Sequence, residues 1–461
     1  MNIKNVRYPV QLRYGYDPML DPWASPLKEI EDSIMRYARL LPEFGYPDEA
    51  QSAVDEAVKQ LSEINSRLAD IAVNAKSDPD EPETLEEIKK LRPEGPRKLT
   101  DGIPGGYHDR FMGSIMGRGA GCTLGAALEF KSVEETRAWA KYTGMEYPPK
   151  DFWKMVKMPL RPCYQTSRME DHCPDYMQSV PADDDTAYTL FGLLLLEKYG
   201  ADFTKDNIAE VFAHEFTPLQ NEEGSWSCYW GERNMLLNIL NGVPADKAGY
   251  LNNPNLQSVA AWTRADTWGY VCPGWPEKAA ELAFKDASMN HRRNGVYGSM
   301  FFAAAIAAAF AVDDPVEAIK IGLTEIPKNC LLAEAINWAL EIAPTIKNYE
   351  DAARAVQNRY GGMFAGHAIN CALFVVFGIL IGGRNFTKVI GETVAMTFDN
   401  DCTGATSGSI VGAVIGKKEL PENWYKPFNN QMDCYLTSLP KRITFDELYE
   451  RYLRQAEIIR K

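Results

Sequence analysis

The sequence lacks the short motifs that mark several large enzyme classes. It has no Gly-x-Ser-x-Gly elbow, no Walker phosphate loop and no Rossmann glycine pattern in its usual context. Its nine cysteines are scattered, with no Cys-x-x-Cys pair and no zinc spacing. An odd number of cysteines without a disulfide framework is typical of a reducing compartment. We therefore expect a cytoplasmic protein whose chemistry depends on other side chains.

Basic clusters and membrane-length apolar runs are also scarce. The formal net charge is −14 and no basic run occurs, which argues against nucleic acid as the main partner. The first residues, 1–5, lack the apolar core of a signal peptide. The apolar segment 363–383 contains His367 and Asn370 and has no second span to match it. We expect a buried central helix there and no membrane insertion.

What the sequence does contain is typical of a globular, all-α protein. Hydrophobic residues make up 45% of its 461 residues and charged residues 24%. Helical spacing recurs along the whole chain, and convincing β alternation is scarce. The helices expected after residue 100 span 180–198, 276–290, 295–312, 315–323, 331–342, 350–359 and 364–381.

Residues 1–100 look separate from the rest, so we expect an N-terminal helical extension (1–100) and a main helical domain (101–461). The extension has helical spacing over 26–41 and 47–74, then a charged, proline-containing stretch. A short helix over 84–91 has Thr84 as its cap, with Glu87 in capping-box position. The extension could pack on the main body or on a second subunit, which would give a homo-oligomer.

Two glycine ladders are unusual for helices. Glycine inside a helix costs about 1 kcal/mol relative to alanine. Four in register predict a compensating close approach of another backbone, although loops are the simpler alternative. The apolar residues between the glycines favour helices. The ladders are Gly113, Gly117, Gly121, Gly125 and Gly404, Gly408, Gly412, Gly416.

Two acidic motifs each open an apolar helix. Asp183, Asp184 and Asp185 precede the run 190–196, and Asp399 and Asp401 precede the second glycine ladder. One aspartate at such a place needs only a capping role. Several adjacent carboxylates repel one another, and a hard divalent cation such as Mg²⁺ would remove that conflict. Two such motifs in one chain favour a metal site.

In these motifs the chain resembles the ADP-ribosylglycohydrolase superfamily. Residues 117–130 are similar to the family's opening helix, which ends in Gly-x-x-x-Glu. Residues 183–189 resemble Thr-Asp-Asp-Thr-x-Met-Thr, and 399–405 resemble Asp-Thr-Asp-Thr followed by small residues. Residues 269–309 resemble the intervening segments. The resemblance covers about 106–425, and its motifs fall in the family's order.

The resemblance implies an all-α ADP-ribosylglycohydrolase-like bundle that hydrolyses a ribosyl N- or O-glycosidic bond with Mg²⁺ or Mn²⁺, two ions or one. Its substrate would be a small ribosyl or glycosyl compound or an ADP-ribosylated acceptor. A water held by metal or aspartate would attack an oxocarbenium-like centre. The metal ligands implied are Asp183, Asp184, Asp185, Asp399, Asp401 and Cys402. The catalytic residues implied are Glu129, Asp184 and Asp185. The substrate-binding residues implied are Gly125, His291, Asn294, His367 and Asn370.

Two cysteines depart from the family pattern. Cys402 stands where the family often has a threonine ligand, and Cys122 stands at the usual aspartate of a Gly-Asp pair. A thiol is a poor partner for Mg²⁺, so one metal could be weaker, differently coordinated or absent. Two alternatives stay open: a hydrolase of small glycosides, for which the segment 161–180 could narrow the pocket, and a non-catalytic ligand-binding or structural member.

Overall fold

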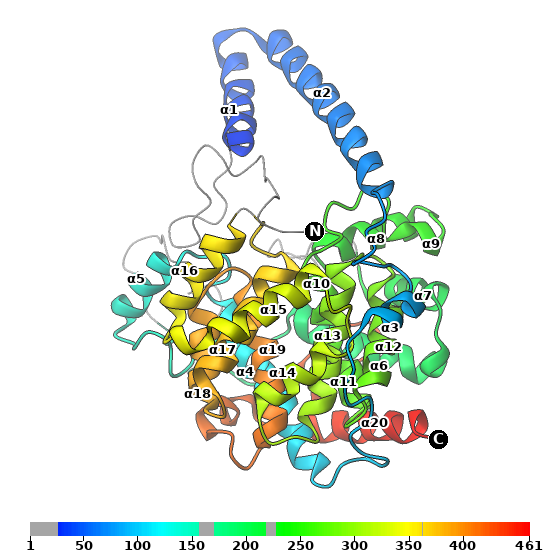
Figure 1. Cartoon of the computed structure of the whole chain (residues 1–461). Helices are drawn as coiled ribbons and strands as arrows, with labels where there is room; N and C mark the ends of the chain where they lie inside the picture. The colour runs from blue at the N-terminus through cyan, green and yellow to red at the C-terminus, as the bar shows by residue number, and fades with distance from the viewer. Residues whose placement is uncertain (1–25, 156–169, 218–226, 362) are drawn as a thin grey trace.

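The computed structural model describes residues 26–155, 170–217, 227–361 and 363–461, and that part of the chain is almost entirely helical. Figure 1 shows a helical body from which two N-terminal helices project. The strands described, β1 (Gln431–Asp433) and β2 (Arg442–Thr444), form one short antiparallel pair with Met432 opposite Ile443. The all-α prediction is confirmed.

The centre of the body is built from helices whose surfaces are apolar or small on every side. Every residue of α13 (Asn294–Ala309) is buried, because its alanines let neighbouring helices approach from several directions. α17 (Ala368–Gly382) lies beside it and is buried from Ala368 to Ile379. Within the described residues, no helix is long and apolar enough to cross a membrane. The expected central helix is therefore found, but it begins at 368 because His367 caps it.

The glycine ladders bring α4 (Tyr107–Ala126) and α19 (Asn400–Ile415) into backbone contact. A Cβ on Gly117 would lie 2.4 Å from the carbonyl oxygen of Gly408. A Cβ on Gly121 would lie 1.9 Å from the carbonyl oxygen of Gly404. The order of these pairs shows that the helices run antiparallel. The predicted close approach is confirmed, except that Gly416 lies just past the helix end, with φ of 74°.

The remaining helices surround this pair and fix its two ends. Around the site these are α6 (Asp184–Tyr199), α8 (Trp230–Leu240), α10 (Ala260–Thr263), α11 (Ala265–Val271), α12 (Pro276–Ala287) and α18 (Phe386–Ala395). The outer helices are α5 (Val133–Thr143), α7 (Lys205–Glu215), α9 (Ala245–Ala248), α14 (Pro315–Leu323), α15 (Leu331–Ile342), α16 (Tyr349–Tyr360) and α20 (Phe445–Ile459).

The helix predicted over 180–198 begins four residues later than expected. Val180 instead forms a β-bridge with Met432, and its N–H donates to the Gln431 carbonyl at 2.9 Å. The helix α6 starts at Asp184, with Asp183 as its N-cap. The extended stretch before the cap ties the start of α6 to the C-terminal part of the chain.

The N-terminal extension consists of a projecting arm and an anchored segment. The arm, defined here as residues 26–73, contains α1 (Pro26–Leu40) and α2 (Pro47–Val73) and stands off the body in Figure 1. The segment that follows includes α3 (Leu85–Leu91), capped by Thr84 as predicted. It is pinned to the body by ion pairs of Arg92 and Arg97 with the buried Glu325.

Candidate functional site

The start of α6 presents three consecutive carboxylates in different surroundings. Asp183 closes a capping box: its Oδ1 accepts from the Asp185 N–H at 2.9 Å, and its own N–H donates to Thr186 Oγ1. Asp183 and Asp184 are half-buried, whereas Asp185 is fully buried. Because the Thr186 hydroxyl is engaged with the backbone, the candidate metal-binding oxygens at this helix end are those of the carboxylates.

The start of α19 brings two further carboxylates to the same place. Asp399 is the N-cap and Asp401 lies in the first turn, and both are buried. Glu129 follows the end of α4, and the Phe130 N–H donates to the Phe398 carbonyl at 2.9 Å, which joins the two chain segments. Carboxylate oxygens of Glu129, Asp399 and Asp401 lie within 4.8 Å of one another. These three residues are called the oxygen group below.

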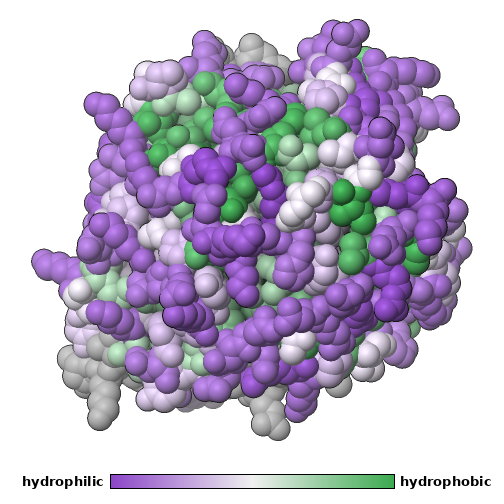
Figure 2. Space-filling model, turned by 90° about the horizontal axis from the view of Figure 1, so that it is seen from below, coloured by the Kyte–Doolittle hydropathy of each residue, from purple (hydrophilic) through white to green (hydrophobic). Residues whose placement is uncertain are grey.

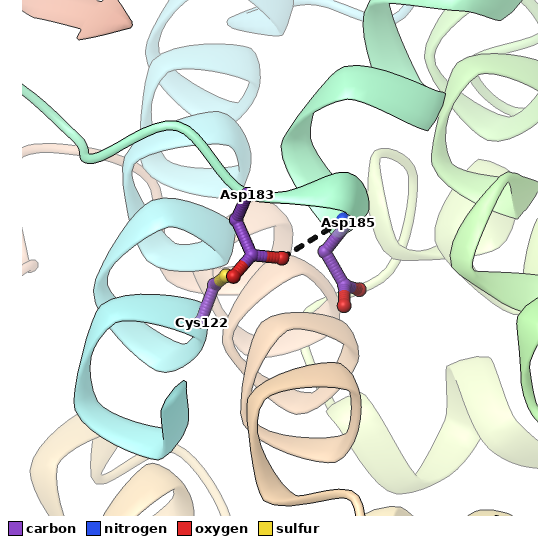
Figure 3. A group of neighbouring side chains, drawn as sticks. All are labelled: Cys122, Asp183 and Asp185. Atoms are coloured by element: carbon purple, nitrogen blue, oxygen red, sulfur yellow. Dashed lines mark hydrogen bonds between the residues drawn. The ribbon is translucent and has the colours of Figure 1, made fainter. Parts of the chain in front are cut away.

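Two other groups of three nearby donor atoms each contain a cysteine. Cys122 lies within 4.8 Å of Asp183 and Asp185, and Figure 3 shows its sulfur, on α4, facing the Asp183 carboxylate. Cys402 forms the other group with Asp185 and Asp401, and its Sγ donates to Asp185 Oδ2 at 3.0 Å. The structure therefore brings every proposed metal ligand except Asp184 into one of the three groups.

Asp184 is close enough to the other carboxylates of the cluster for their charges to affect its pKa. Burial raises its pKa well above the ordinary value, and the carboxylates of Asp183, Asp185 and Glu129 raise it further. Its side chain is half-buried and belongs to none of the three donor groups of the described residues, so we place it at the edge of the cluster. This position suits contact with a substrate better than a role in the core.

Burial gives Glu129, Asp185, Asp399 and Asp401 pKa values above those of free carboxyl groups. Burial, followed by the neighbouring carboxylates, raises the pKa of Glu129 and of Asp401 well above their usual range. Burial raises the pKa of Asp399 as well. The pKa of Asp185 rises to about 7, because burial outweighs the opposing effect of Arg118. A bound cation would favour the ionised forms of these groups.

The oxygen group also leaves buried acceptors unused. Asp399 Oδ1 and Asp401 Oδ1 have no hydrogen-bond partner among the described residues. Asp399 is 1% exposed and Asp401 4% exposed, so bulk water does not satisfy these atoms freely. Oxygen-only donors are what Mg²⁺ and Mn²⁺ prefer. The residues present therefore fit a hard divalent cation at the oxygen group.

A buried arginine borders the acidic cluster at Asp185. Arg118, on α4, donates through Nη2 to Asp185 Oδ1 at 3.1 Å and through Nη1 to Asp266 Oδ2 at 2.8 Å. The same Nη2 also lies 2.9 Å from the Asp185 carbonyl oxygen. Arg118, Asp185 and Asp266 are each no more than 1% exposed. Asp185 is thus held from two sides, by a guanidinium and by the Cys402 thiol.

Sequence reasoning missed Arg118. The available signal was a charged residue inside the glycine-rich α4, one turn before Cys122. A charge at such a position needs a buried partner, but the sequence does not show which partner. In the sequence, Cys122 stands out only as a departure from a family pattern, whereas the structure places its sulfur beside two aspartates of the cluster.

Three of the predicted substrate-binding residues are engaged in other contacts. A Cβ on Gly125 would lie 2.2 Å from the Asn400 carbonyl oxygen, so this glycine lets α19 begin beside α4. His291 is buried and bonds to Ser258 and Asn290. The Asn294 side chain bonds to Glu81 of the extension, to Gln257 and to the Leu332 N–H.

The other two predicted substrate-binding residues lie at the start of α17: His367 is its N-cap and Asn370 is in its first turn. His367 is half-buried, accepts from the Ile369 N–H through Nδ1, and lines a cleft of about 360 Å³ with Phe364 and Arg292. Asn370 is buried, and its Oδ1 has no hydrogen-bond partner among the described residues. Of the segment 161–180, residues 161–169 lie outside the described residues.

Comparison with known proteins identifies the family of the chain. The family described as ADP-ribosylglycohydrolase matches residues 104–456, which is most of the chain. The chain therefore belongs to the ADP-ribosylglycohydrolase family, a family of hydrolases. A solved "ADP-ribosylglycohydrolase-related protein complex" is similar to it with 16% identity and a TM-score of 0.49, over 76% of this chain and 98% of that one. No curated protein sequence matches it.

Proposed function

We propose that the protein is a metal-dependent glycohydrolase that cleaves a ribosyl N- or O-glycosidic bond in an ADP-ribosyl or nucleoside-like substrate. The observation that carries this proposal is the oxygen group of Glu129, Asp399 and Asp401, which has two buried, unpartnered carboxylate oxygens. Family membership supports glycoside hydrolysis, and the acidic cluster offers donors suited to the hydroxyl-rich face of a ribose. Mg²⁺ or Mn²⁺ is the proposed cofactor.

The carboxylates of the cluster have different tasks in this proposal. Glu129, Asp399 and Asp401 would hold the cation, which when bound supplies a fixed positive charge for the vicinal hydroxyls of the sugar. Asp184, at the edge of the cluster, would contact the sugar. Glu129 and Asp185 are, with Asp184, the proposed catalytic carboxylates, and Glu129 would contact the sugar or orient the attacking water.

The substrate-binding roles of His291, Asn294, His367, Asn370 and Gly125 remain part of the proposal. The division into an extension (1–100) and a catalytic domain (101–461) does too. The family match starting at residue 104 supports that division. Two alternatives predict other cleavage results. A small-glycoside hydrolase would cleave small glycosides only, and a non-catalytic ligand-binding or structural member would cleave no compound.

A substrate panel tests the proposal directly. The metal-stripped protein, with and without added Mn²⁺, would be incubated with ADP-ribosylated peptide, small ADP-ribose derivatives, nucleosides and small glycosides. We expect release of a ribosyl product only with Mn²⁺, and loss of release on adding a chelator. Asp184→Ala should lower the rate about 100-fold, because the edge carboxylate is lost. The products would be measured by liquid chromatography.

Asp202→Ala is the control for this experiment, because Asp202 is fully exposed and its nearest cationic nitrogen, on Lys285, is 3.9 Å away. This variant should cleave as the wild type does. Cleavage of small glycosides alone would replace the ribosyl proposal by its first alternative. No cleavage of any compound by a protein that binds Mn²⁺ would favour the non-catalytic alternative. Cleavage that survives the chelator would contradict the metal requirement.

We also propose that the arm (residues 26–73) joins two copies of the chain. Twelve of the nineteen large apolar side chains exposed among the described residues lie on it. On α2, Leu61, Ile64, Leu68 and Ile71 are 43–64% exposed and repeat at three and four residues, the spacing of a coiled-coil seam. By contrast, the face of the body in Figure 2 is mainly hydrophilic, with separate hydrophobic patches. An exposed apolar stripe of this kind is typical of an interaction surface.

Charges placed in the seam should separate the copies. The double variant Leu61→Asp/Ile64→Asp is expected to shift the molar mass measured by light scattering from that of a dimer to that of a 51.7 kDa monomer. Ser62→Asp/Ser66→Asp adds the same charge to the other side of α2 and should leave the mass unchanged. A wild-type protein that is monomeric at micromolar concentration would contradict this proposal.

A further inference from the structure

The three groups of candidate cation ligands differ in whether their oxygen atoms already accept hydrogen bonds. In the oxygen group, Asp399 Oδ1 and Asp401 Oδ1 are buried and unpartnered among the described residues. In the two groups that contain a cysteine, the shared residue is Asp185, and both of its carboxylate oxygens are occupied. Oδ1 accepts from Arg118, and Oδ2 accepts from the Cys402 thiol.

The cysteines are also unsuited to a hard cation at these positions. The Cys402 thiol already donates to Asp185 Oδ2 at 3.0 Å. Cys122 lies within 4.8 Å of Asp183 and Asp185 and would likewise offer sulfur. Sulfur is a soft ligand, whereas Mg²⁺ and Mn²⁺ prefer oxygen donors. Neither cysteine-containing group therefore fits the cation that the oxygen group fits.

A positive charge is nevertheless present at Asp185. The Arg118 guanidinium is fully buried between Asp185 and Asp266. Asp266 is itself fixed, since Ser409 and Tyr270 donate to its Oδ1. Arg118 is therefore anchored at one end and presents its other nitrogen to Asp185. A fixed guanidinium at this distance balances the carboxylate charge that a second cation would otherwise balance.

From these contacts we propose that the chain binds a single divalent cation, at Glu129, Asp399 and Asp401, and that Arg118 occupies the electrostatic role of a second one at Asp185. The inference rests on the proposed function only for the choice of a hard cation. Arg118 is a positioning residue: it holds Asp185 and does not itself contact the ion. The Cys402 thiol completes the positioning of Asp185 from the other side.

Metal stoichiometry tests this inference without any substrate. The metal-stripped full-length protein would be titrated with Mn²⁺ while the free ion is followed by electron paramagnetic resonance. We expect one bound Mn²⁺ per chain, and at least tenfold weaker binding for Asp399→Asn. With Co²⁺ we expect an oxygen-ligated spectrum without a thiolate charge-transfer band. Two equivalents of Mn²⁺ with similar affinity, or a thiolate band, would overturn the inference.

The role of Arg118 is tested by variants that remove or keep its charge and by a variant of another buried arginine. Arg118→Met combined with Cys402→Thr should admit a second equivalent of Mn²⁺, whereas Arg118→Lys, which keeps a cation, should stay at one. Arg264→Met is the matched control, because Arg264 is equally buried and also pairs with two carboxylates, Glu232 and Asp286. It should stay at one equivalent. If the double variant does not fold, a second equivalent bound by Arg118→Lys would still refute the role of Arg118.

The outcomes separate this inference from the proposed function. If the protein binds one Mn²⁺ but cleaves no ribosyl compound, the inference of a single cation stands and the proposed function is contradicted. If it cleaves a ribosyl compound with two bound Mn²⁺, the proposed function stands and the inference is contradicted. Failure to bind Mn²⁺ at all overturns both, since both place the ion on the oxygen group.

Discussion

Asp401→Asn is expected to lower kcat/KM on the best substrate of the panel by about 1,000-fold, equivalent to about 4 kcal/mol of transition-state stabilisation. Asparagine keeps the size and one oxygen of the side chain but removes the charge that would hold the cation. Asp401 Oδ1 is buried and has no hydrogen-bond partner among the described residues. No hydrogen bond from the protein therefore compensates for the lost contact with the cation. Steady-state kinetics with saturating Mn²⁺ would measure the effect.

The same substitution should not unfold the protein. Burial and the carboxylates of Glu129 and Asp399 oppose the ionised form of Asp401, so a neutral side chain relieves repulsion when the cation is absent. We expect the thermal midpoint of the metal-stripped variant to equal or exceed that of the wild type, as measured by calorimetry. Asp314→Asn is the control: Asp314 caps α14 at a distance from the site, and asparagine caps as well as aspartate. Full activity of Asp401→Asn would contradict the assignment.

The elements of the fold could be predicted because their signals are local. Apolar spacing, proline at helix starts and the Thr84 cap all act within a few residues, so the helices over 315–323 and 331–342 are found with the predicted bounds. The start of α6 was predicted wrongly, because Val180 pairs with Met432, about 250 residues further along the chain. No local sequence pattern predicts a partner so far along the chain.

The candidate site, like the fold, has parts that the sequence predicts and parts that it does not. The acidic motifs could be recognised because several carboxylates before an apolar helix are unusual for capping alone. The pairing of Arg118 with Asp185 and Asp266 could not be predicted, because it joins α4, α6 and α11 through side chains that are distant in sequence. For Asn294, the structure shows bonds to Glu81 of the extension, which give this residue an anchoring role that the sequence did not suggest.

The glycine ladders connect the fold to the site, because α4 leads to Glu129 and α19 begins with Asp399 and Asp401. Gly121→Ala is expected to lower the free energy of unfolding by about 3 kcal/mol or more, in the upper range of overpacking effects. The added Cβ would lie 1.9 Å from the Gly404 carbonyl oxygen and 2.2 Å from its carbon. Both partners are helix backbone, so neither can rotate away, and the gain of about 1 kcal/mol in helix propensity is too small to offset the clash.

Gly102→Ala is the matched control for this prediction. No described atom lies within 4 Å of a Cβ built on Gly102, so alanine there should change stability by less than about 1 kcal/mol. Thermal unfolding of both variants would be followed by calorimetry, and Mn²⁺ binding would be measured on the folded fraction. Because the clash pushes α4 and α19 apart, Gly121→Ala should also weaken Mn²⁺ binding, whereas Gly102→Ala should not. If Gly121→Ala kept wild-type stability and Mn²⁺ affinity, the close helix contact would not be what holds the oxygen group together.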